Sequence, residues 1–471
     1  MNSCKLASAL LTALICASCA VGPDYRRPDT KVPETWSEAP DKGVSIGSFE
    51  LVRWWETLND PVLNTLVERA IKSNPDLRLA EARLREARAA REMATADLWP
   101  SLNASGSYSR AHAGIAPSSK EKSTTSLFQI GFDAAWELDI FGGLRRSVEA
   151  AQASVGAAKE SHRDVIVSLL AEIARNYVEL CGLQQQIAIT KDNIKTQSDT
   201  VELTQARFAV GLASEIDVLK ASSQLTNTQS QIPILESLAK HSIHRLGILL
   251  GSEPGALIGE LSCAGNIPPV PPDVPVDLPS DLLRRRPDIR AAERELAAAT
   301  ARIGVAVADL FPRFSLTGSL GRQGLNFSDL GDGTNKFWKV GPTIEWPIFE
   351  AGRIRANINI QNARQEQALA FYEKTVLAAL EEVENALVDY AKEQASRNSL
   401  IETVDANLQS VSLSTELYAK GLTDFLTVLD AERSLYTSQD QLVQSEKTVV
   451  LNLIALYKAM GGGWEAYSKP D

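Results

Sequence analysis

The sequence lacks most of the features on which common functions depend. Only four of its 471 residues are histidine and 6% are aromatic, and three of its five cysteines fall in the first nineteen residues. This composition leaves little for a metal cluster, a disulfide scaffold or a histidine-based enzyme. No apolar run of about 20 residues follows the N-terminus, which excludes helical membrane spans. The net charge of −11 lacks the basic excess of a nucleic-acid binder.

The N-terminal residues have the pattern of an export signal. Lys5 precedes an apolar run from Leu6 to Ile15, and the small residue Ser18 stands directly before Cys19. This order resembles a bacterial lipoprotein signal, so we expect residues 1–18 to be removed and Cys19 to carry a covalent lipid. The alternative is an ordinary signal peptide cut nearby. Residues 19–60 are expected to form an extended linker.

An internal repeat determines the organisation of the rest of the chain. Similar segments recur in the same order at an offset of 210 to 212 residues: 74–77 with 286–289, 98–100 with 310–312, and 208–212 with 418–422. The chain is therefore a duplication. We place the first repeat at 61–266 and the second at 280–462, with a proline-rich linker at 267–279 and a C-terminal tail at 463–471.

Each repeat contains two segments in which apolar and polar residues alternate. In one of them Phe128, Ile130 and Phe132 alternate with glutamine, glycine and aspartate. Such a period of two over about ten residues is typical of a strand with one apolar face. The predicted strands are 101–112, 125–137, 313–323 and 336–346.

Long helices follow each strand pair. Residues 353–420 contain neither glycine nor proline over 68 positions, which is enough for a helix of roughly 100 Å. We expect long helices throughout 352–460 and, in the first repeat, as far as about residue 250. Gly156, Gly182 and Pro233 predict kinks or breaks there. The narrow apolar stripe of these helices suits a coiled-coil wall.

Strands with an apolar outer face and a polar inner face match an outer-membrane barrel. Four strands cannot close a barrel, and an open edge is not tolerated in lipid. The chain must then combine its strands with those of further copies. Three copies would give twelve strands around a water-filled lumen, although closure alone also permits other copy numbers.

Four passages resemble one known family: residues 19–25 (CAVGPDY), 54–55 (WW), 278–289 (LPSDLLRRRPDI) and 426–433 (LTVLDAER). Together with the duplication, they identify the chain as similar to the TolC-like outer-membrane efflux proteins, and among them the OprM-like (NodT-type) lipoproteins. The resemblance implies a mixed α and β membrane protein: a homotrimer whose 12-stranded barrel in the outer membrane continues into a long periplasmic α-helical barrel. It also implies a periplasmic adaptor protein and an inner-membrane pump of the RND or a similar type as partners. It implies no nucleic acid and no cofactor besides the lipid.

Two Gly-Leu turns join the long helices, and glycine at such a place ends a helix in the left-handed conformation. They need be nothing more than turns. The resemblance implies that they are periplasmic tips that contact the adaptor. The residues concerned are Gly211, Leu212, Ala213 and Ser214 in the first tip, and Gly421, Leu422, Thr423 and Asp424 in the second.

Asp430 and Arg433 are three residues apart on one helix face, beyond the second tip. One interpretation is a solvated ion pair. The resemblance implies a periplasmic gate instead, in which Leu426 forms an apolar ring and Asp430 points into the tunnel. Three carboxylates around the axis would favour cations.

Other candidates are weaker. His241 and His244 lack a carboxylate partner for a metal site, and residues 284–286 (RRR) favour structural pairing over nucleic-acid contact. Cys181 and Cys263 are candidates for a disulfide whose geometry the sequence does not give. Neither a nucleophile with its base nor a phosphate-binding loop is evident, so we expect no enzyme activity.

The sequence favours a passive gated efflux duct, which a pump and an adaptor supply with substrate. Alternatives are an outer-membrane factor for type I protein secretion, a stand-alone porin and an envelope-spanning structural protein. Helices of this length disfavour a porin, and a polar strand interior disfavours a stalk. The exported substrate is left open.

Replacing the predicted lipid-bearing residue tests the N-terminal interpretation. Cys19→Ser is expected to abolish incorporation of labelled palmitate, because the thiol that accepts the lipid is gone. Label that persists in the variant would show that another residue is modified. Insertion of the barrel is expected to continue, since closure does not depend on the anchor.

Overall fold

The computed structural model describes residues 20–37, 44–46, 51–113, 123–262, 265–271, 274–276 and 278–467. Cys19 and Cys263 lie outside these residues. The chain forms two compact units, and both halves of the duplication contribute to each. The sheet unit comprises Met1–Asp29, Arg83–Lys159 and Ala291–Glu373; the helical unit comprises Thr30–Ala82, Glu160–Arg290 and Lys374–Asp471.

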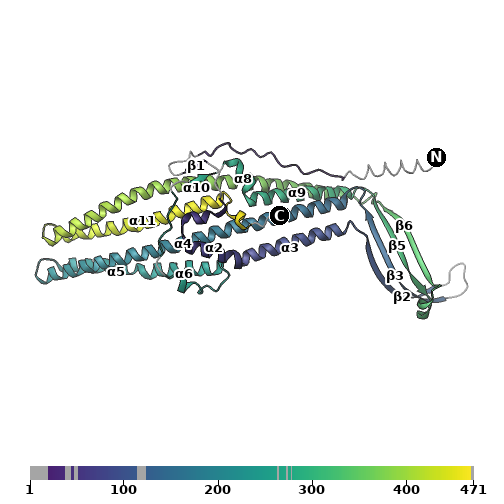
Figure 1. Cartoon of the computed structure of the whole chain (residues 1–471), viewed down its shortest axis with the longest axis horizontal. Coiled ribbons are helices and arrows are strands. Elements are labelled where there is room, and N and C mark those ends of the chain that lie inside the picture. The colour runs from purple at the N-terminus through teal and green to yellow at the C-terminus, as the bar shows by residue number, and fades with distance from the viewer. Residues whose placement is uncertain are drawn as a thin grey trace. The chain divides into compact units, whose positions relative to one another are not determined.

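The sheet unit contains four antiparallel strands in the order β2-β3-β5-β6 (Figure 1). Their bounds are Ser101–Ala113 for β2, Ser123–Leu138 for β3, Arg313–Gly324 for β5 and Lys336–Glu345 for β6. Each bound lies within two residues of the position that the alternating pattern predicted. Two further short strands of the helical unit, β1 (Val44–Ile46) and β4 (Val274–Val276), pair in parallel.

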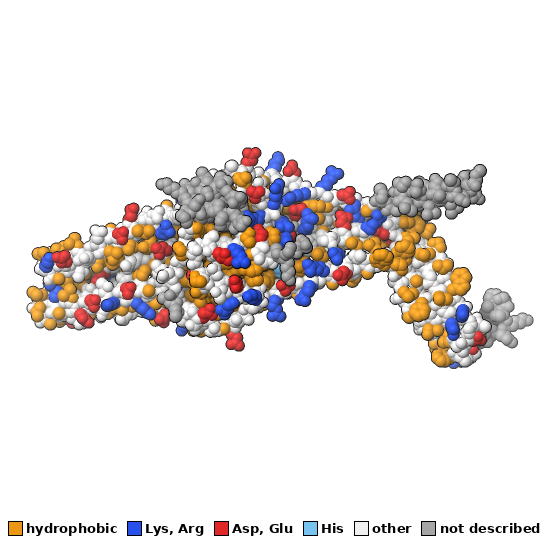
Figure 2. All heavy atoms as spheres, viewed as in Figure 1, with side chains coloured by type: hydrophobic (Ala, Val, Ile, Leu, Met, Phe, Trp, Pro, Cys, Tyr) orange, Lys and Arg blue, Asp and Glu red, His pale blue; other side chains and the backbone are white. Residues whose placement is uncertain are grey.

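The register places apolar side chains in rows across one face of this sheet. Phe132 pairs with Leu320, which in turn pairs with Trp338. The neighbouring row on the other face is polar and contains Asp133 and Ser319. The apolar rows are exposed to solvent in the single chain, and Figure 2 shows apolar side chains gathered over the strands. Such a face is expected to contact lipid.

The helices repeat with the duplication: α3 and α9 have 22 residues each, and α4 and α10 have 67 each. In the described chain, the helices are α2 (Pro61–Ser73), α3 (Pro75–Ala96), α4 (Gly143–Ala209), α5 (Glu215–Gln229), α6 (Gln231–Leu249), α7 (Ile258–Leu261), α8 (Pro279–Arg285), α9 (Pro287–Ala308), α10 (Arg353–Ala419) and α11 (Phe425–Ala459), with 3-10 helices η1 (Leu51–Leu58), η2 (Phe327–Gly331) and η3 (Trp464–Tyr467). No described helix is long and apolar enough to cross a membrane.

The expectation of breaks at two glycines of the first repeat is wrong. Helix α4 continues through Gly156 and Gly182. Only the expected break near Pro233 is present, at Ser230 between α5 and α6. A Cβ at Gly156 would lie 3.1 Å from the Arg294 side chain, and one at Gly182 would lie 2.6 Å from that of Lys447. These glycines make room for a side chain of a neighbouring helix, which is a packing requirement rather than a helix end.

The main apolar core belongs to the helical unit and includes two segments that the sequence suggested to be peripheral. Trp54 and Trp55, from the predicted linker, are 1% and 2% exposed. Trp54 stacks on Tyr457 at 5.3 Å between ring centroids, and Trp55 stacks on Tyr467 of the predicted tail at 6.0 Å. Both segments are therefore part of the folded unit.

The residue before each copy of the duplicated Pro-Asp motif makes an equivalent hydrogen bond in the two repeats. The side chain of Asn74 donates to the carbonyl oxygen of Leu249 at 2.9 Å, at the end of α6. Arg286 donates to that of Ala459 at 2.8 Å, at the end of α11, and also pairs with Asp288 and Glu382. Each repeat thus ties the start of one helix to the otherwise unpaired carbonyl at the end of another.

Adjacent residues of β5 allow a matched test of the two sheet faces. Leu316→Arg, on the apolar face, is expected to cost up to roughly 2–4 kcal/mol of barrel stability, because a charge enters the apolar part of the bilayer. Thr317→Arg, on the polar face, is expected to be tolerated. Heat resistance of the assembled protein in gels and its recovery from the outer membrane measure both effects. Equal tolerance of the two changes would reject the face assignment.

Candidate functional site: the helix tips and the adjoining helix segment

The two predicted tip turns have the same backbone geometry. Gly211 and Gly421 adopt φ angles of 78° and 75°, which favour glycine. In the first turn the amides of Gly211 and Leu212 donate to the carbonyls of Phe208 and Arg207. The second turn repeats both bonds 210 residues later. This pair of hydrogen bonds is the Schellman motif, so both helices end by the same mechanism.

The next helix begins four residues after each glycine, directly after its N-cap residue. Ser214 caps α5 and exchanges hydrogen bonds with Asp217, and Asp424 caps α11 by accepting from the amide of Thr427 at 3.0 Å. Hydrogen bonds from the Thr427 hydroxyl and amide hold the pKa of Asp424 below its usual value. Ala213 and Thr423 fill the equivalent positions between glycine and cap. Each tip is a tight connection fixed at both ends.

The two tips lie side by side at one end of the helical unit (Figure 1). The Arg207 guanidinium donates to the carbonyl oxygen of Ala419 at 3.1 Å and lies 4.6 Å from the ring centroid of Tyr418. Several large apolar side chains are nevertheless exposed there: Val210, Leu212, Ile216, Leu219 and Leu422. An exposed apolar surface of this kind is typical of an interaction site.

The predicted gate residues lie on an exposed face of α11. Leu426 is 47% exposed, and Asp430 is exposed one turn later. Arg433 does not pair with Asp430 within the chain; its Nε donates to the amide oxygen of Gln224 on α5 at 2.9 Å. No ion pair to Asp430 is present among the described residues. The carboxylate is therefore available to the space in front of α11, while Arg433 links α11 to α5.

Glu432 lies between these two residues in sequence but faces the helix interface. It is 5% exposed and accepts a hydrogen bond from the Thr200 hydroxyl of α4 at 2.6 Å. It lines a cavity of about 150 Å³ together with Gln197, whose buried amide has no partner among the described residues. Burial raises the pKa of Glu432, and the bond from Thr200 partly offsets this shift.

The remaining candidates serve the fold. Arg285 and Arg286 make ion pairs with Glu465, Asp288 and Glu382, as the prediction of structural pairing required. Cys181 is buried and forms no disulfide with a described residue, and burial raises the pKa of its thiol to about 12. No group of three potential metal ligands occurs in the described part of the chain.

Sequence reasoning missed the partners of Glu432 and Arg433 on α11. Gln224 is 209 positions from Arg433, and Thr200 is 232 from Glu432. Neither partner belongs to a motif, because a hydrogen bond between helices needs only one suitable side chain at the crossing. The duplication is the one available signal: it predicts that the two tips lie together, and with them α5 and α11.

Comparison with known proteins gives consistent similarity over the whole chain. The outer membrane efflux protein family matches residues 66–252 and 278–462. Nodulation protein T of Rhizobium leguminosarum bv. trifolii is 34% identical over 460 residues, 97% of each chain. Outer membrane protein OprJ of Pseudomonas aeruginosa is 32% identical over 463 residues, 97% of this chain and 96% of OprJ. The solved outer-membrane channel OprN superposes with a TM-score of 0.90 at 39% identity, covering 95% of this chain and 100% of OprN.

The buried Glu432 predicts a pH dependence of stability. Because its pKa is raised in the folded state, that state keeps the proton to higher pH than the unfolded chain does. The contribution of Glu432 to stability is therefore complete below the ordinary glutamate pKa of about 4.3 and is lost as the pH rises through the raised value. Glu432→Gln is expected to flatten this dependence, since the amide stays neutral.

The measurement is the midpoint temperature at which the protein loses its helical structure. It is taken from about pH 4, below the pH range in which Glu432 is expected to ionise, to about pH 7, above that range. Glu402→Gln, an exposed position on α10, is the matched control and should follow the wild type. Parallel pH profiles for the wild type and Glu432→Gln would show that ionisation of Glu432 does not affect stability.

Proposed function

Because the chain belongs to the outer membrane efflux protein family, we propose that it forms the outer-membrane channel of a tripartite efflux system. In this proposal it is a passive, gated duct that carries solutes from an inner-membrane pump and a periplasmic adaptor to the outside. No catalytic step is involved. The predicted fold class is confirmed by the similarity to OprN, whose channel fold this chain shares along nearly its whole length.

The observation that carries the proposal is the open sheet. Strands β2 and β6 lie at its two edges, and three successive antiparallel pairings make them antiparallel to each other. β6 of one copy can therefore pair with β2 of the next and continue the same ladder. A barrel of this kind satisfies every backbone edge in lipid, and three copies provide twelve strands.

The structure of the two tips is consistent with the proposed contact with an adaptor. Both are short turns with exposed leucines, and their helix ends are fixed by hydrogen bonds, so an apolar surface is presented on a rigid support. The exposed Asp430 supports the gate, because carboxylates from three copies would line one opening and favour cations. A lipid at Cys19 would anchor the N-terminus to the same membrane as the barrel.

Recordings from the purified protein in planar bilayers test the duct and its gate. We expect small, intermittent, cation-preferring openings that a large trivalent cation blocks. Asp430→Ala should remove both the preference and the block. Arg433→Ala should raise the conductance, because the bond to Gln224 is lost.

Gln224→Leu is the matched control, because it removes the same bond from the other side while leaving the charge of Arg433 in place. It should raise conductance as Arg433→Ala does. Large constant openings would indicate a porin, and no openings at all would indicate a structural protein. Unchanged selectivity and conductance in the Asp430 and Arg433 variants would leave the pair as ordinary surface charges.

A further inference from the structure

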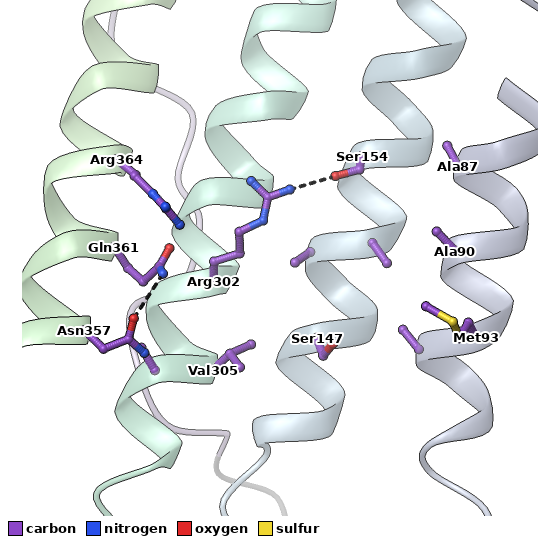
Figure 3. A pocket seen from close by; sticks show the side chains of 14 residues that line it. Ala87, Ala90, Met93, Ser147, Ser154, Arg302, Val305, Asn357, Gln361 and Arg364 are labelled. Atoms are coloured by element: carbon purple, nitrogen blue, oxygen red, sulfur yellow. Dashed lines mark hydrogen bonds between the residues drawn. The ribbon is translucent and has the colours of Figure 1, made fainter. Parts of the chain in front are cut away.

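A pocket of about 460 Å³ lies among four helices of the sheet unit, α3, α4, α9 and α10 (Figure 3). Alanines and Met93 provide most of its apolar lining. Arg302, Arg364 and Ser154 are among its polar residues. The pocket is separate from the tips and from the proposed gate residues of α11, and all four helices that line it come from one chain.

The pocket is positively charged in a protein of net charge −11. Two arginines and no carboxylate are among its lining residues. Arg302 donates to the Ser154 hydroxyl at 3.2 Å, and neither arginine makes an ion pair with a described residue. A guanidinium has five N–H donors, so most of those on Arg302 stay available to a ligand. The charge complement of this pocket is an anion.

The face on which the pocket opens follows from the N-terminal segment. Gly304 on α9 packs against it so closely that a Cβ there would lie 2.9 Å from the carbonyl oxygen of Val21. Glu293, three turns earlier on the same face of α9, accepts from the hydroxyl of Tyr25 at 3.2 Å. Arg302 is two residues from Gly304, about 200° around the helix, so the pocket lies on the opposite face.

This opposition identifies the inside of the proposed duct. The N-terminal segment follows the predicted lipid-bearing Cys19, and a lipid chain must reach the membrane that surrounds the barrel. The face of α9 against which this segment packs is then the outer one. The pocket with Arg302 and Arg364 consequently opens toward the path of the exported solutes.

We propose that the pocket binds amphiphilic anions in transit, such as molecules with one carboxylate, sulfate or sulfonate group on an apolar body. Arg302 and Arg364 bind the head group, which suits the forked donors of guanidinium. The apolar body lies against the alanines and Met93, where it leaves water. This inference rests on the proposed function, because only an open duct brings solutes to this face.

The test uses decanesulfonate below its micellar concentration, applied to the full-length protein in planar bilayers. We expect it to block the wild-type channel, and to do so less at high salt, because the contact is charged. The double variant Arg302→Gln with Arg364→Gln should raise the half-blocking concentration on the order of tenfold. Block by the neutral amphiphile decyl maltoside should be the same in both proteins.

Arg355→Gln is the matched control, because Arg355 is an exposed arginine nine residues before Arg364 and so on the opposite face of α10. It should behave as the wild type. Conducting channels that decanesulfonate blocks equally in the wild type and the double variant would reject the pocket and leave the duct intact.

Absence of any channel would instead reject the proposed function. Equilibrium binding of decanesulfonate to the protein in nanodiscs then decides about the pocket without a current. Binding that falls in the double variant but not in Arg355→Gln supports the site. Equal binding by all three proteins rejects it.

Discussion

The structure depends on one constraint: a strand edge in lipid has no water to satisfy its backbone groups. One chain supplies four strands and leaves β2 and β6 unpaired at the edges. An apolar face on every strand commits the sheet to the membrane, and the even number of antiparallel strands lets identical copies complete it. The duplication, the alternation of apolar and polar residues in the strands and the assembly of several copies therefore all serve to pair every strand edge in the membrane. None of the three would be sufficient alone.

The helices meet a different requirement, since a hollow tube has no centre to fill with large apolar side chains. Packing occurs between neighbours in the wall, and small residues allow the close approach. Gly156 and Gly182 show this directly, because each makes room for the stem of a basic side chain from the next helix. The main cluster of bulky core side chains lies in the helical unit, where Trp54, Trp55 and Tyr457 pack together.

The strands could be predicted from the sequence because a period of two has no other common explanation, and the tips because glycine marks both repeats. Local patterns did not distinguish a glycine that ends a helix from one that admits a neighbour, so Gly182 was misread. They also did not show that Trp464 packs beneath Arg163 of α4, or that Gln224 receives the Arg433 bond. Such contacts depend on which helices cross, and that information is absent from any short segment.

The two repeats have similar backbones, but their tips lead into helices of different length. This difference affects how a partner would bind to the assembled ring. The first tip leads into α5, which ends after 15 residues, whereas the second leads into α11, which continues for 35. In a ring of three copies, six turns would alternate between these two kinds. A partner made of identical subunits would then meet two non-equivalent contact sites, three of each. Its binding would follow threefold rather than sixfold symmetry, with two affinities in place of one.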